Sequence, residues 1–575
     1  MPFLTEAVQG DQAVYLSVFI AIMRYLGPAL MVLLLVRCIW PLITFRREPE
    51  IWAWLILDDN TRLPVTHWES VIGTNKHSDI VIDDSSVSPN HAVLTRYDDG
   101  SWTVTDADSD AGVLVNGKKV QIHALEPEDV IRIGGVEMVL KPISKKQEQH
   151  IAQLRTKASS FFTSLANVLL LTVFQLLCGI VFMLSGDRET IAGVLMGFGG
   201  IMLCQWLLLL FYVCIRRTSF EVETIAFFLC TMGMAAIATV CPGEAMKQLI
   251  AMVLGLLIFL VIGWALRNLE RVKQMRYLAA VAGVGFLLIT LVFGEEINGA
   301  KNWLMIGSFS LQPSEFSKVC FVFIGASPMD RLMKKKNLIF FIAYSVMICG
   351  FLAIMNDFGT ALIFFVAFLV IAYMRSGSVG TLALALTALG FAGVTAMRIA
   401  PHMLDRFATW GHIWEDTGGK GWQQATCMMC MVSGGFFGLG PGQGWLDEST
   451  MFAADSDMVI ATIGEEWGLI TVILIVLCLA ALAFFAIRSA SVGRSSFYTI
   501  ASCTAASILL VQAILNALGT VDILPLTGVT FPFLSNGGSS MIASWGLLAF
   551  IKAADTRQNA SFAVRLVKRG GEDIE

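Results

Sequence analysis

The chain has 575 residues, of which 56% are hydrophobic and only 15% are charged, and its mean hydropathy is +0.69. This apolar excess is greater than a soluble core needs and indicates a polytopic membrane protein. The formal net charge of −5 excludes the strong basic excess that binding of nucleic acid requires, so we expect no nucleic-acid partner.

Roughly thirteen apolar runs approach membrane-spanning length, one isolated near the N-terminus and the others clustered. They lie at about residues 14–36, 165–184, 190–213, 224–240, 249–266, 278–293, 316–326, 338–355, 358–373, 382–396, 458–486, 498–518 and 541–551. The run at 316–326 is too short by itself, so we expect it to recruit the polar turn before it. The first run has no small-residue cleavage site after it, so we expect an anchor, and we expect Arg24 inside it to snorkel or to pair with a partner helix.

Basic residues at the ends of these runs fall on one side of the predicted membrane, for example Arg216, Arg271, Arg375 and Arg488. Such residues favour the cytoplasm when they lie in short loops. We therefore expect a multi-pass protein whose N-terminus is outside and whose C-terminus is inside. Residues 557–575 are then a cytoplasmic tail.

Residues 51–145, between the first two runs, have a different texture. Short β-prone segments alternate with turns such as Asn116-Gly117, which is typical of an all-β sandwich, and the charge rule makes it cytoplasmic. The segments IGTNKHSDIVIDD, SVSPNHAVL, DADSDAGVLVNGKKV and LEPEDVIRIGG follow one another in the order and spacing of a forkhead-associated (FHA) domain, which this insert resembles.

The FHA resemblance implies loops that read phosphothreonine, here with Ser88, His91 and Asn116. This sequence differs from the usual FHA motif at two positions, since Thr74 stands in place of the usual Arg and Ala111 in place of the usual Asn. The Arg supplies the fork of donors that suits phosphate best. Two expectations stay open: a phosphothreonine protein binds here, or the module docks partners without phosphate and His91 is a hydrogen-bonded core residue.

Several motifs follow in the clustered runs. They are NGAKNWLMIGSFSLQPSEFSK, NDFGTA, WEDTGGKGWQQ, GGFFGLGPGQG, DSDMVIATIGEEWG and LPLTGVTFPFLSNGGSS. In this order they resemble the SEDS family of peptidoglycan glycosyltransferases, of the FtsW and RodA type. The resemblance implies a bacterial cytoplasmic-membrane protein with a ten-helix core at residues 219–556, two additional helices at 160–218 and an anchor at 1–50. The expected fold class is a polytopic all-α membrane protein with an all-β FHA-like cytoplasmic sandwich.

The expected chemistry joins a sugar on a lipid diphosphate to an acceptor hydroxyl, which needs a base and a positive charge or metal at the leaving diphosphate. Asp416, in a long loop expected outside, falls on the family's essential aspartate, so the resemblance implies the catalytic base. An Asp beside glycines is otherwise a turn residue. Glu415 is the weaker alternative. We expect help from a divalent cation, Mg or Mn, at an unknown site, and no organic cofactor.

A second group of expected substrate-binding residues lies inside the membrane. Glu315 and Lys318 are spaced i, i+3 on one helical face, and Gln312 precedes them. The resemblance implies a central cavity for this segment, whereas the alternative is an ion pair that only holds helices together. Lys301 and Trp303 lie in the outside approach, where the Lys could meet diphosphate.

Other polar residues carry weaker expectations. Asp357 is predicted to cap the helix that follows it. One of Glu465 and Glu466 should line the cavity while the other faces an interface. A tight turn near the outer face is expected to contribute substrate contacts through Ser535, Gly537 and Gly538.

The resemblance thus implies an inverting enzyme that polymerises lipid II. A lipid II flippase and a division scaffold that docks partners through the FHA-like insert remain alternatives. A class B penicillin-binding protein is an expected partner, because the chain has no Ser-x-x-Lys type cross-linking residues of its own. The Cys427-x-x-Cys430 pair lacks a thioredoxin-like setting, so we do not expect redox chemistry or metal binding there.

Overall fold

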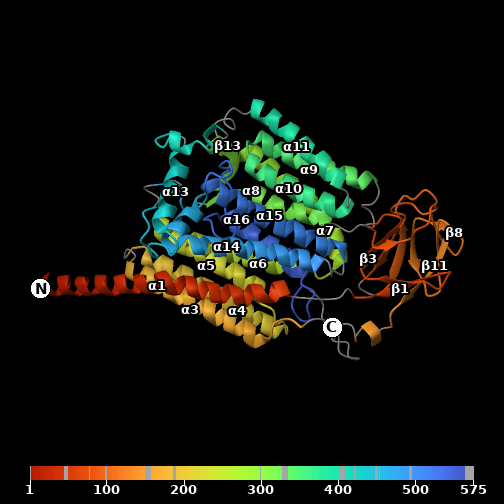
Figure 1. Ribbon diagram of the computed structural model, residues 1–575, viewed down its shortest axis with the longest axis horizontal. Helices are drawn as coiled ribbons and strands as arrows, with labels where there is room; N and C mark the ends of the chain where they lie inside the picture. The colour runs from red at the N-terminus through yellow and green to blue at the C-terminus, as the bar shows by residue number, and fades with distance from the viewer. Residues whose placement is uncertain are drawn as a thin grey trace.

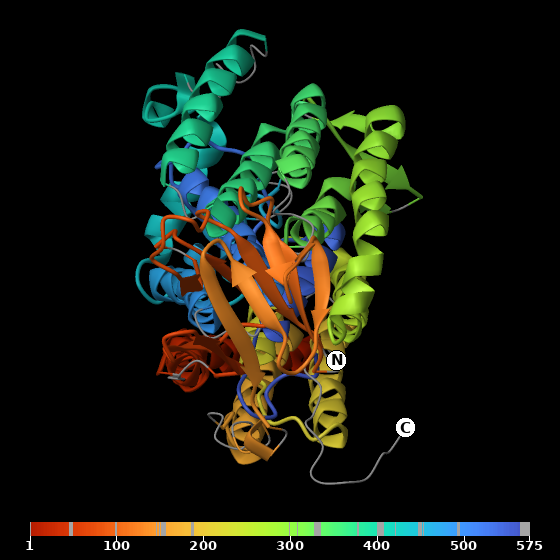
Figure 2. The same cartoon turned by 90° about the vertical axis from the view of Figure 1, so that its right-hand side faces the viewer.

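The computed structural model describes residues 2–563 apart from short gaps at 45–49, 77, 98–99, 145, 149, 151–156, 186–188, 298, 308, 327–334, 377–378, 400–407, 420, 447–450, 452 and 491–494. Figure 1 shows a large bundle of helices with a β-sandwich at one end. Figure 2, turned by 90°, looks onto the sandwich with the bundle behind it.

Each predicted apolar run lies within one helix, to within a residue at its ends. The helices are α1 (Pro2–Thr44), α3 (Phe161–Ser185), α4 (Ile191–Cys214), α5 (Glu221–Val240), α6 (Ala245–Ala265), α7 (Leu269–Phe293), α8 (Pro313–Ala326), α9 (Lys335–Ile354), α10 (Phe358–Ser376), α11 (Val379–Ile399), α14 (Val459–Ala490), α15 (Ser496–Thr520) and α16 (Gly538–Ala553). Shorter helices outside these runs are η1 (Pro242–Glu244), η3 (Ile413–Glu415) and α13 (Trp422–Gly434).

Within the described residues, nine helices are long and apolar enough to cross a membrane, fewer than the thirteen or so runs. The difference includes α8, with 14 residues, and α16, with 16. As expected, α8 recruits its polar turn and starts at Pro313, where a missing N–H costs nothing. Even so, it rises only about 21 Å, less than the hydrocarbon thickness.

The first helix, α1, has 43 residues and is about 64 Å long. Its N-terminal part projects beyond the bundle, away from the sandwich (Figure 1). The rest packs against α14, because Gly27 leaves room for the ring of Trp467 and Thr471 Oγ1 donates to Met31 Sδ at 3.7 Å. Gly27 could not carry a Cβ without meeting that ring at 3.2 Å.

The two added helices, α3 and α4, attach to the core through buried amides. The side chains of Gln175 and Gln205 donate to each other at 3.2 and 2.8 Å, and Gln175 also donates to Thr231 Oγ1 of α5 at 2.9 Å. Hydrogen bonds of this kind join helices where lipid removes the hydrophobic driving force. The hairpin is therefore fixed to the core.

The sandwich contains two sheets, as the turn pattern predicted. Its strands are β1 (Ala53–Leu57), β2 (Arg62–Val65), β3 (Glu69–Gly73), β4 (Ile80–Val81), β5 (Ala92–Arg96), β6 (Trp102–Asp106), β7 (Val113–Val115), β8 (Lys118–Val120), β9 (Ile122–Leu125), β10 (Val130–Ile133) and β11 (Val136–Pro142). The sheet orders are β2-β1-β11-β10-β7-β8 and β4-β3-β5-β6-β9. At the β7–β8 turn, Asn116 and Gly117 both have positive φ, 50° and 78°, which is what a two-residue hairpin turn demands.

A small sheet between α7 and α8 has no counterpart in the expectations. It consists of β12 (Glu295–Ile297), β13 (Ala300–Ile306) and β14 (Phe309–Leu311), in that order. Gly299 and Gly307 turn the chain between the strands with φ of 81° and 64°. Lys301 and Trp303 therefore lie on a strand.

Residues 557–563, the described part of the predicted C-terminal tail, pack against the bundle. Phe562 packs where Gly263 has no side chain, since a Cβ there would lie 2.2 Å from its ring. Arg557, Ser561 and Ala563 are also buried. Residues 564–575 lie outside the described residues.

The sandwich contacts the end of the bundle where α15 begins. Glu69 of β3 accepts a hydrogen bond from the Ser496 hydroxyl in the first turn of α15, and it also interacts electrostatically with Arg375 near the end of α10. Strand β3 is buried along its whole length. One face of the sandwich is thus tied to the helix ends.

Candidate functional site

The turn that carries Asp416 joins η3 to α13. The backbone N–H groups of Gly419 and Gly421 both donate to the Asp416 carbonyl oxygen at 3.2 Å, which curls the chain into a tight turn. The Asp416 side chain is exposed and lies directly over Gly419, where a Cβ would meet Oδ2 at 2.4 Å. The missing side chain of Gly419 therefore sets where this carboxylate lies.

Glu415, the alternative base, faces a different partner. Its Oε1 lies 3.1 Å from Nδ1 of His412 on the exposed surface of the loop. The two adjacent acidic groups thus have different neighbours, and His412 competes for the proton-accepting oxygen of Glu415.

The loop that carries Asp416 is held against the C-terminal end of α15, a contact here called the Asp522 clamp. Its residues were not predicted from the sequence. The Gly411 N–H donates to both carboxylate oxygens of Asp522 at 3.1 and 3.0 Å, and Trp410 Nε1 donates to the carbonyl of Ile523 at 3.1 Å. Gln424 Nε2 donates to the Gly519 carbonyl at 2.7 Å. Asp522 has a positive φ of 57° in the structure, a conformation in which aspartate is enriched.

Glu315 and Lys318 form the ion pair that their spacing predicted. Lys318 Nζ lies 2.7 Å from Glu315 Oε1 and donates to Gln512 Oε1 at 3.0 Å. The Lys318 side chain is 0% exposed and that of Glu315 4%, so the structure holds the pair inside the bundle rather than open to a cavity. Gln512 on α15 was missed because it lies in an ordinary apolar run.

The same polar network continues across the bundle. Gln512 Nε2 donates to the carbonyl and hydroxyl oxygens of Thr530 at 3.0 and 3.1 Å, and the Thr530 hydroxyl donates to Ser540 at 2.8 Å. These contacts connect α8, α15, the loop after α15 and α16. A polar chain of this kind is costly unless every member is paired.

Asp357 caps α10 as predicted, because its Oδ1 accepts the Thr360 N–H at 3.1 Å. Its other oxygen accepts from Gln312 Nε2 at 3.2 Å and from Asn302 Nδ2 at 3.3 Å. The cap therefore also ties the β13 strand and the start of α8 together. Gln312 belongs to this group, not to the contacts of Lys318.

Lys301 is directed elsewhere. Its ammonium donates to the carbonyl of Leu291, near the end of α7, at 2.8 Å, and its N–H donates to the Met355 carbonyl at 2.9 Å. Trp303 pairs with Glu295 across the β12–β13 ladder. Both residues stabilise the strand that carries them, and neither contacts the Glu315–Lys318 pair.

We expected one of Glu465 and Glu466 to line a cavity and the other to face an interface. Instead, both are buried against the segment 434–444, here called the glycine-rich loop. Glu465 Oε2 accepts the Leu446 N–H at 3.1 Å, and Glu466 Oε1 accepts the Gly444 N–H at 3.3 Å. Gly438, with φ of 82°, permits this packing because a Cβ there would lie 2.0 Å from the Glu466 carbonyl oxygen. The carboxylates fold the loop onto α14.

The turn before α16 is tight, as predicted. Ser535 Oγ accepts the Phe531 N–H at 2.7 Å and donates to the Ser456 carbonyl at 2.6 Å. A Cβ on Gly537 or Gly538 would lie no closer than 3.4 or 3.8 Å to any neighbouring atom, so close packing of the backbone does not require glycine at these two positions. The close approach is instead at Gly233 of α5, where a Cβ would lie 2.3 Å from the Leu534 carbonyl oxygen.

The loops of the sandwich that would read a phosphate are occupied internally. The Ser88 hydroxyl donates to Asp110 Oδ2 at 3.2 Å, and the Asp110 N–H donates back to that hydroxyl at 3.1 Å. His91 is a fully buried core residue that accepts the Ser88 N–H at Nδ1 and donates from Nε2 to the Gly112 carbonyl. Asn116 donates to Asp129 Oδ1 and accepts the Val130 N–H, which ties the β7–β8 turn to the start of β10.

No group of three or more His, Cys, Asp and Glu side chains that could hold a metal ion occurs among the described residues. Asp416 alone could supply only one ligand, so the residues present fit only a cation that substrate phosphates also hold. Cys427 and Cys430 are buried on α13, and burial raises the pKa of the Cys430 thiol to about 12. Such a thiol is unreactive.

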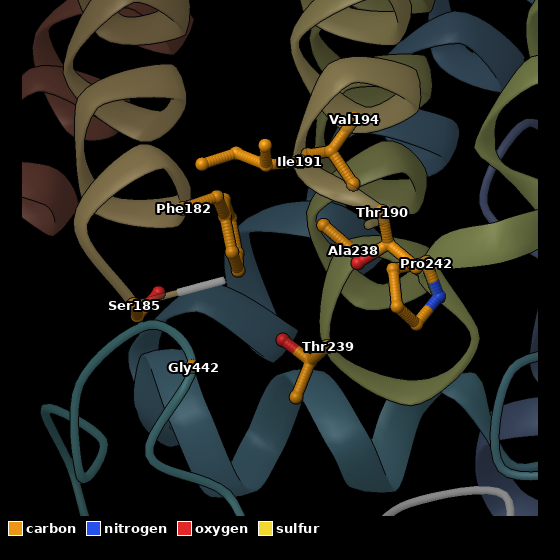
Figure 3. A pocket seen from close by; sticks show the side chains of 9 residues that line it. All are labelled: Phe182, Ser185, Thr190, Ile191, Val194, Ala238, Thr239, Pro242 and Gly442. Carbon is orange, nitrogen blue, oxygen red and sulfur yellow. The ribbon is translucent and has the colours of Figure 1, made fainter. Parts of the chain in front are cut away.

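A cavity of about 180 Å³ lies elsewhere, between the added helices and the core. Figure 3 shows Phe182 and Thr239 on its walls, with the Gly442 segment beside them. None of the predicted site residues lines it. It belongs to the junction of the added hairpin rather than to the Asp416 turn.

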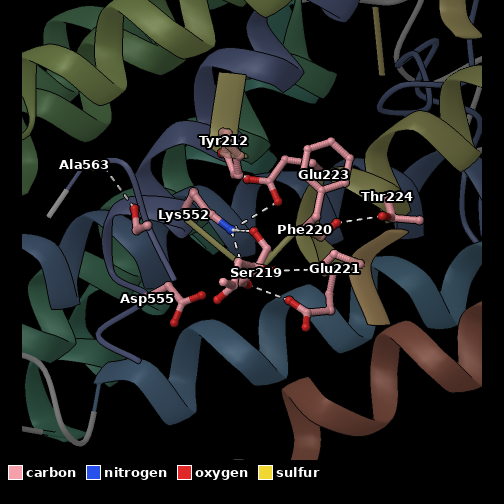
Figure 4. Close-up of polar contacts among 12 residues, drawn as sticks. Tyr212, Ser219, Phe220, Glu221, Glu223, Thr224, Lys552, Asp555 and Ala563 are labelled. Carbon is pink, nitrogen blue, oxygen red and sulfur yellow. Dashed lines mark hydrogen bonds and ion pairs between the residues drawn. The ribbon is translucent and has the colours of Figure 1, made fainter. Parts of the chain in front are cut away.

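A second buried cluster of charges joins the α4–α5 connection to the C-terminal segment (Figure 4). Lys552 Nζ contacts Glu223 Oε2 at 3.1 Å and the Ser219 carbonyl at 3.0 Å. Arg557 pairs with Asp555 at 2.8 Å and with Glu221 at 3.4 Å. Each of these charged side chains has a partner of opposite sign, so we interpret the cluster as a structural lock, that is, a set of buried ion pairs that holds the C-terminal segment against the α4–α5 connection.

Comparisons with known proteins point to one family. The model of the cell cycle protein family of FtsW, RodA and SpoVE matches residues 243–560, and an FHA domain model matches residues 70–134. The peptidoglycan glycosyltransferase RodA of Mycobacterium tuberculosis is 29% identical over 327 residues, which cover 54% of this chain and 69% of that protein.

A protein of Borreliella burgdorferi, named as a probable peptidoglycan glycosyltransferase FtsW, is 30% identical over 281 residues, which cover 46% of this chain and 74% of its own. A solved structure described as a peptidoglycan synthase complex that coordinates polymerization and crosslinking covers 58% of this chain and 96% of its own. Its identity is 22% and its TM-score 0.49.

Proposed function

This chain belongs to the FtsW, RodA and SpoVE family and is a multi-pass membrane peptidoglycan glycosyltransferase, and we propose that it polymerises lipid II with Asp416 as the base. The observation that carries the proposal is the Asp416 turn, an exposed carboxylate seated over Gly419 at the end of the bundle away from the sandwich. The process served is cell division or the maintenance of cell shape.

In the proposed reaction, Asp416 takes the proton of an acceptor sugar hydroxyl. The hydroxyl oxygen attacks the anomeric carbon of the lipid-linked donor, a new glycosidic bond forms with inversion, and the bond to the diphosphate breaks. The lipid diphosphate leaves with its electron pair. A base matched to the acceptor is worth about 10²–10⁴ in rate.

The leaving diphosphate needs compensating charge. A divalent cation, Mg or Mn, held by Asp416 and by substrate phosphates would supply it when bound. Lys301 would have to leave the Leu291 carbonyl to reach a phosphate. Glu315 and Lys318 act at a distance from the carboxylate in this proposal, by fixing α8 against α15.

We further propose the orientation that the basic residues suggest, with the sandwich in the cytoplasm and Asp416 outside. The length of α15 supports the placement of the two on opposite sides of the membrane. This helix has 25 residues and spans about 37 Å, with the Glu69 contact at its start and the Asp522 clamp just beyond its end. A class B penicillin-binding protein is the proposed partner for cross-linking.

The experiment compares bond making with transport. The purified native chain is given fluorescent lipid II and a divalent cation, with and without a cognate transpeptidase, and the products are resolved by gel electrophoresis. In parallel, vesicles measure movement of the same lipid between leaflets. We expect glycan polymers. Lipid movement without polymer in either condition would favour the flippase, and neither activity would favour a scaffold.

A further inference from the structure

Arg24 on α1 is a charged side chain without a hydrogen-bond partner among the described residues. Its Nε is buried and its N–H donates to no described oxygen, and the only described interaction of the side chain is with the ring of Tyr25, 6.0 Å from the guanidinium carbon. Its helix belongs to the added N-terminal part of the chain, outside the matched family core. An unpaired guanidinium in a membrane helix costs several kcal/mol, so it marks a binding role by default.

The depth of Arg24 follows from the packing of α1 on α14. Gly27 lies against Trp467 and Ile20 lies against Gly440 of the glycine-rich loop. Trp467 is roughly 12 Å along α14 from its start, and Arg24 is about one helical turn nearer that end. Arg24 lies about 12 Å along α1 from Leu16, where the candidate span begins, so the guanidinium lies in the half of the membrane on the Asp416 side and can extend toward the lipid phosphates there.

The surroundings of Arg24 are those of a lipid boundary. Ile22 is 50% exposed, Tyr25 59% and Leu26 39%, so the helix face beside it is apolar and open. Phe437 from the glycine-rich loop lies 5.3 Å from the Tyr25 ring. Aromatic residues of this kind collect at the headgroup level of a bilayer.

We propose that Arg24, flanked by Tyr25 and Phe437, binds the phosphate of a membrane lipid in the leaflet on the Asp416 side. A guanidinium presents two parallel donors that fit phosphate oxygens, and its aromatic neighbours supply an apolar rim for the glycerol or prenyl part. Either a phospholipid or a polyprenyl phosphate carries this group. The proposal depends on the proposed function only for the name of the leaflet.

The helix offers a matched control. Arg37 also lies on α1, but its Nε donates to Asn167 Oδ1 at 2.9 Å, so its guanidinium already has a partner. Arg24→Gln and Arg37→Gln remove the same charge from the same helix. Only Arg24→Gln should weaken the binding of a lipid phosphate.

The test uses the full chain in detergent and native mass spectrometry. The probes are phosphatidylglycerol, undecaprenyl phosphate and a diacyl glucoside that lacks phosphate. We expect Arg24→Gln to weaken binding of at least one phosphate lipid by about tenfold, with Arg37→Gln unchanged and the glucoside unaffected. The lipid that loses more identifies the source.

Two results would overturn the proposal. One is equal binding of both phosphate lipids by the native chain and Arg24→Gln. The other is an equal fall in lipid binding in Arg24→Gln and Arg37→Gln, because the effect would then follow the charge of α1 in general and not the guanidinium of Arg24. Polymer formation plays no part in either readout, so failure here leaves the proposed function separately testable.

Discussion

At Asp416 the backbone places the carboxylate, and a neighbouring glycine sets its position. The side chain occupies the space that a Cβ on Gly419 would need. Sequence patterns could place Asp416 on the family motif, but they could not indicate this contact, because a glycine beside an aspartate looks like any turn. The glycine that matters is identified only by geometry.

Gly419→Ala should displace the Asp416 carboxylate without unfolding the protein. A misplacement of about 1 Å in a catalytic group can cost roughly 10²-fold, so we expect polymer formation to fall by about 10- to 100-fold. The control is Gly418→Ala, where an added Cβ meets nothing within 4 Å. Equal rates in the two variants would show that the position of Asp416 over Gly419 does not matter.

The Glu315–Lys318 pair can be tested for a role beyond packing. Lys318→Met leaves a carboxylate buried without its cation, which should cost about 3–5 kcal/mol in the free energy of unfolding. The double variant Glu315→Gln, Lys318→Met should recover most of that stability. We expect the double variant to polymerise at close to the native rate, because the pair acts by fixing α8 against α15, whereas a stable double variant that polymerises poorly would show a role beyond holding helices together.

At the scale of elements, the local sequence pattern predicted the helices, but it could not predict contacts between residues that are distant in the sequence. Every apolar run became a helix, because length and hydropathy are local properties. The β12–β14 sheet was missed, since its short strands form only by pairing with each other. The Asp522 clamp and Gln512 were missed for a related reason: each acts on a partner distant in sequence.

The buried C-terminal cluster predicts a strong dependence on Arg557. Arg557→Gln leaves Asp555 and Glu221 buried without this cation, so we expect a loss of about 3–5 kcal/mol in the free energy of unfolding. Arg132→Gln is the control, because the exposed Arg132–Glu137 pair at 3.8 Å should contribute less than about 1 kcal/mol. Denaturation in detergent measures both, and equal losses would argue against a structural lock.

Across the whole molecule, α15 links the sandwich to the Asp416 loop. Glu69 contacts its first turn, and Asp522 and Gly519 at its far end hold the loop. The resemblance predicted both parts from sequence, but not that one helix connects them. A partner that binds the sandwich is therefore joined to the Asp416 loop through a single helix.

The sandwich should read phosphothreonine weakly, because Asp110 already occupies the Ser88 hydroxyl and repels a phosphate. Asp110→Asn in the full chain should strengthen binding of a phosphothreonine peptide by about fivefold, the effect of roughly 1 kcal/mol. Asp59→Asn, in the β1–β2 turn, changes the net charge equally and is the control. If calorimetry finds the same peptide affinity for both variants, Asp110 does not weaken phosphothreonine binding.

The most direct measurement compares Asp416→Ala with Glu415→Ala in glycan synthesis from fluorescent lipid II, each with the cognate transpeptidase and a divalent cation. The proposed role of Asp416 predicts no polymer from Asp416→Ala and most of the native amount from Glu415→Ala, whose carboxylate faces His412 instead. Native levels of polymer from Asp416→Ala would contradict it.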